Sequence, residues 1–294
     1  MYDIKYHHTD LSDKSFLVTG GAGFIGSNIV EYLLKYGAKK VRVLDNLLTG
    51  NYKNLKPFED NPSFEYMEGD ITDSETCHKA CLGIDYVSHQ AALGSVPRSI
   101  KDPARTNNIN VAGFLNMLIA AKDSQVKMFV YASSSSVYGD EATLPKVETK
   151  IGKPLSPYAV SKYTNELYAS VFHSNYGFNV IGLRYFNVFG PNQDPNGPYA
   201  AVIPVFTDKI VKREVVYING DGSQTRDFTF VENAVQANIR AMLSDNPEAI
   251  NQVFNIAYGE NYTVNDMYDQ IAALLGSDHR PTHRAPREGD IQNS

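Results

Sequence analysis

Short apolar, β-branched runs alternate with longer amphipathic stretches from residue 15 onward. This alternation is typical of repeated β-α units, which build a parallel sheet covered by helices. We therefore expect an α/β protein whose first part is a doubly wound nucleotide-binding unit. The pattern predicts strands at residues 15–19, 40–44, 64–67, 86–89, 127–132 and 180–185, and helices at residues 25–36, 73–81, 104–122 and 158–175.

The composition of the chain changes after Gly190, because residues 191–198 are rich in Pro, Asn and Gly. Such a cluster is typical of a loop, and a helix is expected after it, around 202–212. We therefore predict a first domain over residues 1–188 and a smaller C-terminal lobe over 189–294. Segments near 228–256, a helix at 231–243 and a strand at 253–256, have the pattern to return to the main sheet.

Composition narrows the class of protein. Of the 294 residues, 43% are hydrophobic and 20% charged, the mix of an ordinary soluble globular protein. The formal net charge is −6 and basic residues form no run, so we expect no nucleic-acid partner. No apolar stretch reaches the roughly 18 residues of a membrane span, and Met1–Asp13 is too polar for a signal peptide. A cytoplasmic protein with no membrane partner is the expectation.

The two cysteines, Cys77 and Cys81, are spaced as neighbours on one helix face, where a disulfide is geometrically awkward. We expect reduced structural thiols. His78 and His89 could be grouped with them as a metal site, but nothing fixes their spacing. The prediction is therefore that the protein holds no metal.

A glycine-rich turn, Thr19–Gly26, links the first predicted strand directly to a helix. Glycines in this setting allow a tight turn and let backbone N–H groups reach a dinucleotide pyrophosphate, as in a Rossmann-type unit. Asp45 ends the second strand, 19 residues after Gly26, where a carboxylate can accept both ribose hydroxyls and repel a 2′-phosphate. These features predict NAD rather than NADP. Asp70 and Ile71 follow the third strand, beside the expected adenine edge.

Tyr158 and Lys162 stand at i and i+4 on a helix that Ser156 and Pro157 begin. A nearby ammonium and an oxidised nicotinamide would both favour the phenolate, which could then accept a hydroxyl proton. The run 133–136 is all serine and follows a strand at its C-terminal edge, where ligands bind in such sheets. Alone, the pair could be an ordinary surface feature and the serines a flexible turn. Together they predict a proton-transfer site.

These motifs carry a family resemblance that covers nearly the whole chain. The turn 19–26, Asp45, the segment 89–92, the Ser134, Tyr158 and Lys162 triad and the segment 184–190 resemble the extended short-chain dehydrogenase/reductase family. Within it the chain is most similar to UDP-hexose 4-epimerases, in particular the UDP-N-acetylglucosamine 4-epimerases of surface-polysaccharide synthesis. The resemblance implies oxidation of C4 with bound NAD, reorientation of a 4-keto sugar, and return of hydride to its other face. It also implies a homodimer built on helices 104–122 and 158–175.

The resemblance assigns roles to individual residues. It implies that Ser134, Tyr158 and Lys162 are catalytic. It implies that NAD is bound by Gly20, Gly23, Phe24, Ile25, Gly26, Asp45, Asn46, Asp70, Ile71, Gln90, Ala91, Ala92, Tyr158, Lys162 and Tyr185. It implies that the UDP-sugar is bound by Ser95, Arg98, Ser134, Ser135, Ser136, Asn187, Gln193, Val202, Tyr217, Asn219, Arg226, Arg287, Asp290 and Ser294.

Within the substrate set, Arg226 and Arg287 would pair with the diphosphate, a task that suits guanidinium forks. Asp290 would accept the uridine ribose hydroxyls. Ser294 stands where a small residue admits a 2-acetamido group in related enzymes, which favours an N-acetylated sugar. Relatives usually run several dozen residues beyond this segment, so the sequence does not determine which residues close the sugar pocket.

Other interpretations stay open on the same scaffold. UDP-glucose or UDP-galactose is one alternative sugar, and UDP-N-acetylglucosaminuronic acid is another, with Arg98 as a partner for its carboxylate. Decarboxylases and dehydratases are disfavoured, because dehydratases of this kind carry an Asp-Glu pair where Ser134 and Ser135 stand. A catalytically silent NAD sensor is disfavoured because such proteins typically lose the equivalent of Tyr158 or Lys162, and both are present here.

Overall fold

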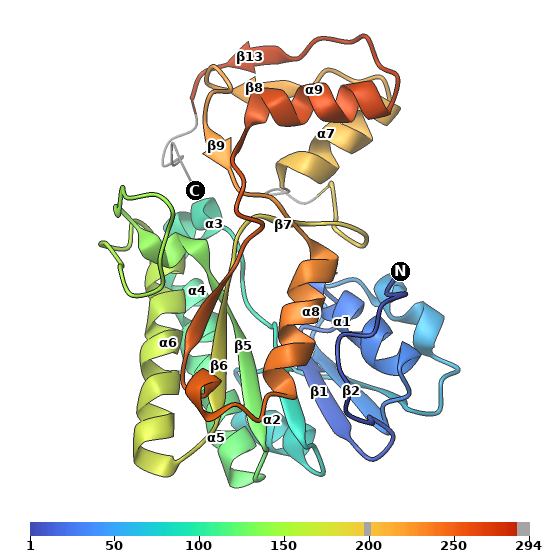
Figure 1. The fold of residues 1–294 in the computed structure, drawn as a ribbon, viewed down its shortest axis with the longest axis vertical. Coiled ribbons are helices and arrows are strands. Elements are labelled where there is room, and N and C mark those ends of the chain that lie inside the picture. Colours follow the sequence, from blue (N-terminus) through green and yellow to red (C-terminus); the bar gives the residue numbers. More distant parts are fainter. Residues whose placement is uncertain (197–200, 287–294) are drawn as a thin grey trace.

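The computed structural model describes residues 1–196 and 201–286. A seven-stranded, fully parallel sheet with the order β11-β6-β5-β4-β1-β2-β3 forms the larger part of the molecule (Figure 1). The predicted Rossmann-type α/β class is thereby confirmed. Its strands are β1 (Ser15–Thr19), β2 (Lys40–Asp45), β3 (Phe64–Glu68), β4 (Tyr86–His89), β5 (Met128–Ser134), β6 (Val180–Tyr185) and β11 (Val253–Ile256).

Helices cover both faces of the sheet, as the predominantly apolar strands require. One face is packed by α1 (Phe24–Lys35) and α8 (Val231–Met242). The other carries α2 (Ser74–Cys81), α5 (Phe114–Asp123) and α6 (Pro157–Tyr176). Cys77 and Cys81 are buried free thiols in this second core. Since the chain order reverses between β1 and its neighbours β2 and β4, a ligand cleft is expected there, at the carboxyl ends of the strands.

The helix α6 begins and ends as its sequence signals indicate. The Ser156 side chain accepts a hydrogen bond from the backbone N–H of Ala159 (3.1 Å), and Pro157 takes the first helical position. Gly177 ends the helix in a left-handed conformation with φ 64°. This firm start fixes Tyr158 in the first turn of the helix, at the edge of the sheet.

The helical run expected over residues 104–122 is not uniform. It consists of α4 (Pro103–Asn107), a π-helical turn η3 (Asn108–Gly113) and α5 in direct succession. In the wide turn, Asn110 accepts from Leu93 N (2.7 Å) and donates to Leu93 O (3.1 Å) and Ser161 Oγ (3.1 Å). These bonds tie the wide turn to the loop after β4 and to α6, contacts that the hydrophobic pattern could not predict.

Two further local predictions need correction. The strand expected at 127–132 extends to Ser134, because Ser133 and Ser134 still pair with β6. The predicted helices leave out a short helix between residues 81 and 104, α3 (Val96–Lys101), whose first turn is capped by the Ser95 hydroxyl accepting from Arg98 N (3.3 Å). Both differences bring polar side chains onto regular elements next to the cleft.

Beyond β7 (Val188–Phe189) the chain leaves the main sheet and builds a smaller lobe, at the top of Figure 1. Its core packs α7 (Val202–Val211) against α9 (Val264–Leu274), with Phe206 and Tyr268 in contact. Three two-stranded pairings complete it: β8 (Tyr217–Asn219) with β13 (Thr282–Arg284), β9 (Thr225–Arg226) with β12 (Tyr262–Thr263), and β7 with β10 (Thr229–Phe230). Between β10 and β12 the chain returns to the main sheet through α8 and β11.

Within the described residues, no helix is long and apolar enough to cross a membrane, and no group of His, Cys, Asp and Glu side chains is arranged to hold a metal.

Candidate active site

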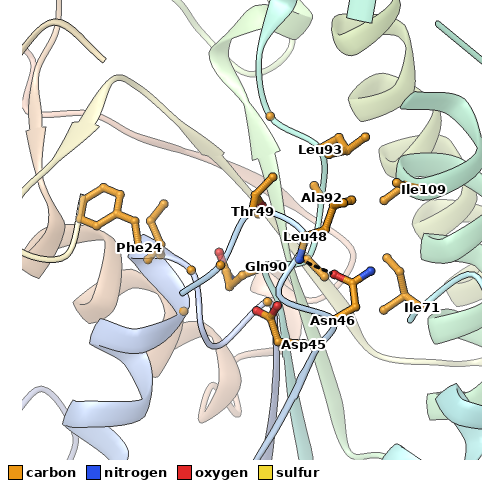
Figure 2. A pocket seen from close by; sticks show the side chains of 18 of the residues that line it. Phe24, Asp45, Asn46, Leu48, Thr49, Ile71, Gln90, Ala92, Leu93 and Ile109 are labelled. Atoms are coloured by element: carbon orange, nitrogen blue, oxygen red, sulfur yellow. Dashed lines mark hydrogen bonds between the residues drawn. The ribbon is translucent and has the colours of Figure 1, made fainter. Parts of the chain in front are cut away.

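A cavity of about 430 Å³ lies at the carboxyl edge of the main sheet, where the order of the strands reverses. Figure 2 shows side chains from the turns after β1, β2, β3 and β4 converging on it, among them Phe24, Asp45, Ile71 and Gln90. All fifteen residues predicted to bind the cofactor line this cavity, together with Ser134 and Asn187. The sequence prediction and the geometry therefore select the same cleft.

The glycine turn has the shape that a dinucleotide requires. Gly20 has φ 68°, and a Cβ at this position would lie 2.7 Å from Ala91 N. A Cβ at Gly26 would lie 2.3 Å from Gly20 O, so only glycine lets α1 begin this close to the turn. The backbone can thus approach a pyrophosphate at the start of α1, where unpaired N–H groups favour an anion. The residues present fit the diphosphate of NAD.

Asp45 is fixed by the same turn. Its Oδ2 accepts from Ala22 N (3.0 Å) and its Oδ1 from Leu47 N (2.8 Å). Burial raises the pKa of this carboxyl, and the two backbone hydrogen bonds oppose that shift. Asn46 extends the contact surface: it accepts from Leu48 N (3.0 Å) and donates to Asp70 (2.7 Å), as Figure 2 shows in part.

We expect Asp45→Asn to weaken NAD binding about tenfold and to reduce the preference of the protein for NAD over NADP. The amide has only one oxygen, so one of the two backbone donors loses its acceptor at a cost of about 1–3 kcal/mol. The repulsion of a 2′-phosphate also disappears with the charge. Calorimetric titration with both dinucleotides measures the effect, with Asp60→Asn, at an exposed position that lines neither this cavity nor the second one, as the control. An unchanged ratio of the two affinities would refute the discriminating role of Asp45.

One end of the cavity is formed by Ser134, at the end of β5, and by Tyr158 and Lys162 on α6. Lys162 is 3% exposed and donates from Nζ to Ala132 O (2.8 Å). Burial lowers the pKa of Lys162 to about 8, against an opposing effect of Glu166. Burial raises the pKa of Tyr158, and a hydrogen bond with Ser134 opposes the shift. The cavity by itself therefore favours a neutral phenol, so a further positive charge is needed to form the phenolate.

The four serines of the run have different surroundings. Ser134 Oγ accepts from Ser136 N (3.2 Å) and Ser136 Oγ (2.9 Å), which leaves its own proton for Tyr158 or a ligand. Ser133 also lines the cavity, but its hydroxyl donates to Glu166 Oε1 (2.5 Å). Ser135 and Ser136 do not line the cavity and begin a 3₁₀ turn instead. Of the three serines predicted to bind substrate, Ser134 lines the cavity and Ser135 and Ser136 do not.

A second cavity of about 420 Å³ lies in the smaller lobe, and Asn187 and Val188 line both cavities. Four predicted substrate residues besides Asn187 line it: Val202, Tyr217, Asn219 and Arg226. Asn187 itself has φ 25° and donates to Asp227 O (2.9 Å). The two cavities therefore adjoin at the junction between the main sheet and the smaller lobe.

Sequence reasoning missed Arg284, which also lines this second cavity. Its Nε donates to Asn219 Oδ1 (2.6 Å), and its guanidinium lies 5.4 Å from the centre of the Tyr217 ring. The pairing of β8 with β13 brings these residues together across more than sixty positions of the chain. No local motif signals such a contact. Leu48, Thr49, Gly50, Leu93 and Ile109 of the first cavity were missed as well.

The remaining predicted substrate residues lie elsewhere. Ser95 caps α3, Arg98 lines a third cavity, and Gln193 donates from its amide to Val188 O (3.2 Å). The structure does not bring these three into the cavities described above. Arg287, Asp290 and Ser294 lie outside the described residues.

Comparison with known proteins places this geometry in a family. Residues 16–257 match the family described as NAD dependent epimerase/dehydratase. A UDP-N-acetylglucosamine 4-epimerase from Methanobrevibacter ruminantium M1, solved with UDP-N-acetylmuramic acid, is 42% identical with a TM-score of 0.90, covering 96% of this chain and 89% of its own. A UDP-glucose 4-epimerase from Thermus thermophilus, solved with NAD, is 35% identical with a TM-score of 0.84, covering 95% and 89%.

A UDP-glucuronate 4-epimerase from Thermodesulfobacterium geofontis is 32% identical over 94% of this chain and 85% of its own length. These relatives act on different UDP-sugars according to their names, and they share one fold. The glycine turn, Asp45 and the cleft at the strand reversal fit the cofactor that defines the family. The chain therefore belongs to the NAD-dependent epimerase/dehydratase family, among relatives that are UDP-sugar 4-epimerases.

Proposed function

We propose that this protein interconverts the C4 epimers UDP-N-acetylglucosamine and UDP-N-acetylgalactosamine through a 4-keto intermediate. The observation that carries the proposal is the position of Ser134 and Tyr158 in the NAD cavity, which adjoins a second cavity lined by Tyr217 and Arg226. A ligand that spans both would have its nucleotide in the smaller lobe and its hexose at the reacting end.

When bound, oxidised NAD supplies the hydride acceptor and a positive charge beside the phenol. That charge and the Lys162 ammonium favour the Tyr158 phenolate, which accepts the proton of the C4 hydroxyl while the C4–H bond gives up its hydride. Ser134 donates to the same oxygen and holds it in place. Return of the proton from Tyr158 and of the hydride to the opposite face of the ketone gives the other epimer, with no net redox change.

The UDP part of the substrate is proposed to bind in the second cavity. The exposed Tyr217 ring and Asn219 would lie by the uracil, and the guanidinium of Arg226 would pair with the diphosphate. Arg284, held beside Tyr217, adds a second cation to this end. Arg287 and Asp290 are proposed for the diphosphate and the uridine ribose on the strength of the sequence resemblance alone.

The choice of an N-acetylated sugar is supported by two observations. Ser294 is small where the resemblance places the gate for a 2-acetamido group, and the Methanobrevibacter ruminantium neighbour is a UDP-N-acetylglucosamine 4-epimerase. Ser95, Arg98 and Gln193 are proposed to line the sugar pocket when it is filled. UDP-glucose and UDP-N-acetylglucosaminuronic acid are the alternative substrates. The remote alternative function is that of a catalytically silent NAD-binding sensor.

The decisive experiment incubates the purified protein, without added NAD, with UDP-N-acetylglucosamine, UDP-glucose and UDP-N-acetylglucosaminuronic acid separately. Nuclear magnetic resonance resolves the C4 epimers of each product. We expect the first substrate to reach an epimer mixture fastest. Faster conversion of either other sugar would correct the substrate, and no conversion of any would favour the sensor.

Enlarging Ser294 to tyrosine should shift preference from the N-acetylated sugar toward UDP-glucose, because the added ring takes the space of the acetamido group. The ratio of kcat/KM for the two sugars should change by about tenfold or more, a typical size for a steric change in a substrate pocket. Ser74→Tyr, at an exposed position of α2 that lines neither cavity, is the control. If the ratio stays at its original value, the gate lies elsewhere.

We further propose a homodimer that packs the 104–122 run and α6 of two copies together. Val160, Leu167 and Val171 are each about half exposed and lie along one stripe of α6, which supports the idea. A cytoplasmic location and a role in polysaccharide synthesis remain predictions from the sequence.

A further inference from the structure

A third cavity, of about 450 Å³, lies on the outer side of the loop that follows β2. One wall consists of Leu48, Thr49 and Leu93, which also line the NAD cavity. The opposite wall is strongly charged and belongs to α3 and α4. It consists of Arg98, Lys101, Asp102 and Arg105. The two cavities thus share Leu48, Thr49 and Leu93 as lining residues.

The loop that contributes Leu48 and Thr49 to the shared wall contacts the glycine turn. A Cβ at Gly50 would lie 3.0 Å from both the carbonyl carbon and the Cβ of Ala22. Asn51 N and the Asn54 side-chain amide both donate to Ala22 O at 3.0 Å. The loop containing Leu48 and Thr49 is therefore fastened onto the glycine turn, whose N–H groups face the cofactor's diphosphate.

The side chains that line the NAD cavity carry a net negative charge, which is unfavourable for the diphosphate of the cofactor. Among the described residues that line it, Asp45 and Asp70 are acidic, and Lys162 at the reacting end is the single basic one. Backbone N–H groups of the glycine turn supply the partial positive charge at the pyrophosphate end. A dinucleotide with a doubly charged diphosphate would therefore gain from cations outside the cavity.

The third cavity provides these cations. Arg98, Lys101 and Arg105 carry three positive charges against one negative charge of Asp102, a formal difference of two. The Asp102 carboxylate accepts from Arg105 N (3.1 Å) as the cap of α4, so it is already engaged with a helix N-terminus. The three long side chains line the same cavity as Leu48 and Thr49.

We propose that Arg98, Lys101 and Arg105 form an outer cationic wall that slows the release of NAD by attracting its diphosphate across, or around the edge of, the 48–49 loop. The substrate also contains a diphosphate, but the second cavity has cations of its own in Arg226 and Arg284. Lys101 and Arg105 therefore act on the cofactor, whereas Arg98 is shared with the proposed sugar pocket. This inference rests on the use of NAD and not on the identity of the sugar.

The test measures how fast the NAD-loaded protein exchanges its cofactor for isotopically labelled NAD. Lys101→Glu with Arg105→Glu should accelerate exchange about tenfold in dilute buffer, because attraction becomes repulsion at two exposed positions. In about 1 M salt the difference from the unchanged protein should largely vanish. Arg98 is left in place because it is proposed to serve the substrate.

Three controls separate this from a structural effect. Arg240→Glu, on the exposed face of α8, alters the net charge without touching the third cavity. Lys101→Gln with Arg105→Gln keeps good helix formers and should show a smaller acceleration of the same salt dependence. ADP-ribose binding should weaken with the Glu pair, whereas adenosine and UDP binding should not. The proposal would be overturned if the Glu pair exchanged NAD no faster than Arg240→Glu, or if its acceleration were insensitive to salt. It would also be overturned if adenosine binding weakened as much as ADP-ribose binding.

Discussion

Tyr158→Phe should lower kcat for epimerisation by about 10²- to 10⁴-fold, the usual contribution of a positioned general base. The substitution removes one oxygen and leaves the ring that lines the cavity. Binding of NAD and of UDP should change little, because the ring that lines the cavity remains in place. Loss of kcat with nearly constant KM would mark an interaction made in the transition state.

Tyr163→Phe is the matched control, since the same atom is removed from the same helix at a position that does not line the cavity. A second measurement follows the phenolate by ultraviolet absorbance. Loading with NAD should lower the pKa of one tyrosine relative to the cofactor-free protein, because the cavity alone raises the pKa of Tyr158. That difference should be absent in Tyr158→Phe. Activity that survives the substitution would exclude Tyr158 as the base.

The fold was readable from the sequence because its signals are local. Strand and helix patterns alternate along the chain, and the glycine turn with Asp45 fixes where the first two strands end. In a parallel sheet the carboxyl ends of the strands meet at one edge, so residues after each strand could be assigned to one cleft. This is why the predicted cofactor residues all line the same cavity.

The features that the sequence did not predict depend on contacts between segments that are distant along the chain. Arg284 reaches the second cavity because β13 pairs with β8, and the π-helical turn is joined to the loop after β4 by the bonds of Asn110 to the backbone of Leu93. The charged wall of the third cavity arises where α3 and α4 pack beside the loop after β2. None of these has a repeating or motif-like signal in the chain. Each is a product of tertiary packing.

Glu166 and Arg184 form another such contact, a buried ion pair next to β5. Arg184 donates from Nη2 to Glu166 Oε2 (2.8 Å) and from Nε to Oε1 (2.9 Å), and the two side chains, Arg184 and Glu166, are 3% and 6% exposed. Ser133 donates to the same carboxylate, one residue before Ser134. The pair thus joins α6, β5 and β6 directly beneath the reacting end.

Glu166→Gln should lower the free energy of unfolding by about 3–5 kcal/mol, because it leaves the Arg184 charge buried without a counterion. The amide also turns one former acceptor into a donor that faces the guanidinium. Denaturant unfolding measures the loss. Glu65→Gln is the matched control: it alters an ion pair with Arg42 whose acid is 41% exposed, where about 0–1 kcal/mol is expected. Equal losses in both variants would contradict a special role for the buried pair.

The same substitution should also be visible in the pH dependence of the reaction. Glu166 opposes the fall in the Lys162 pKa that burial causes, so removing its charge should bring that pKa further below about 8. Lys162 supports the Tyr158 phenolate only while it is protonated, and activity therefore falls as pH rises through its pKa. In Glu166→Gln this decline should begin at a lower pH than in the unchanged protein. A variant that is less stable but keeps the original alkaline limit would show that the pair holds the strand and helix together without tuning the ammonium.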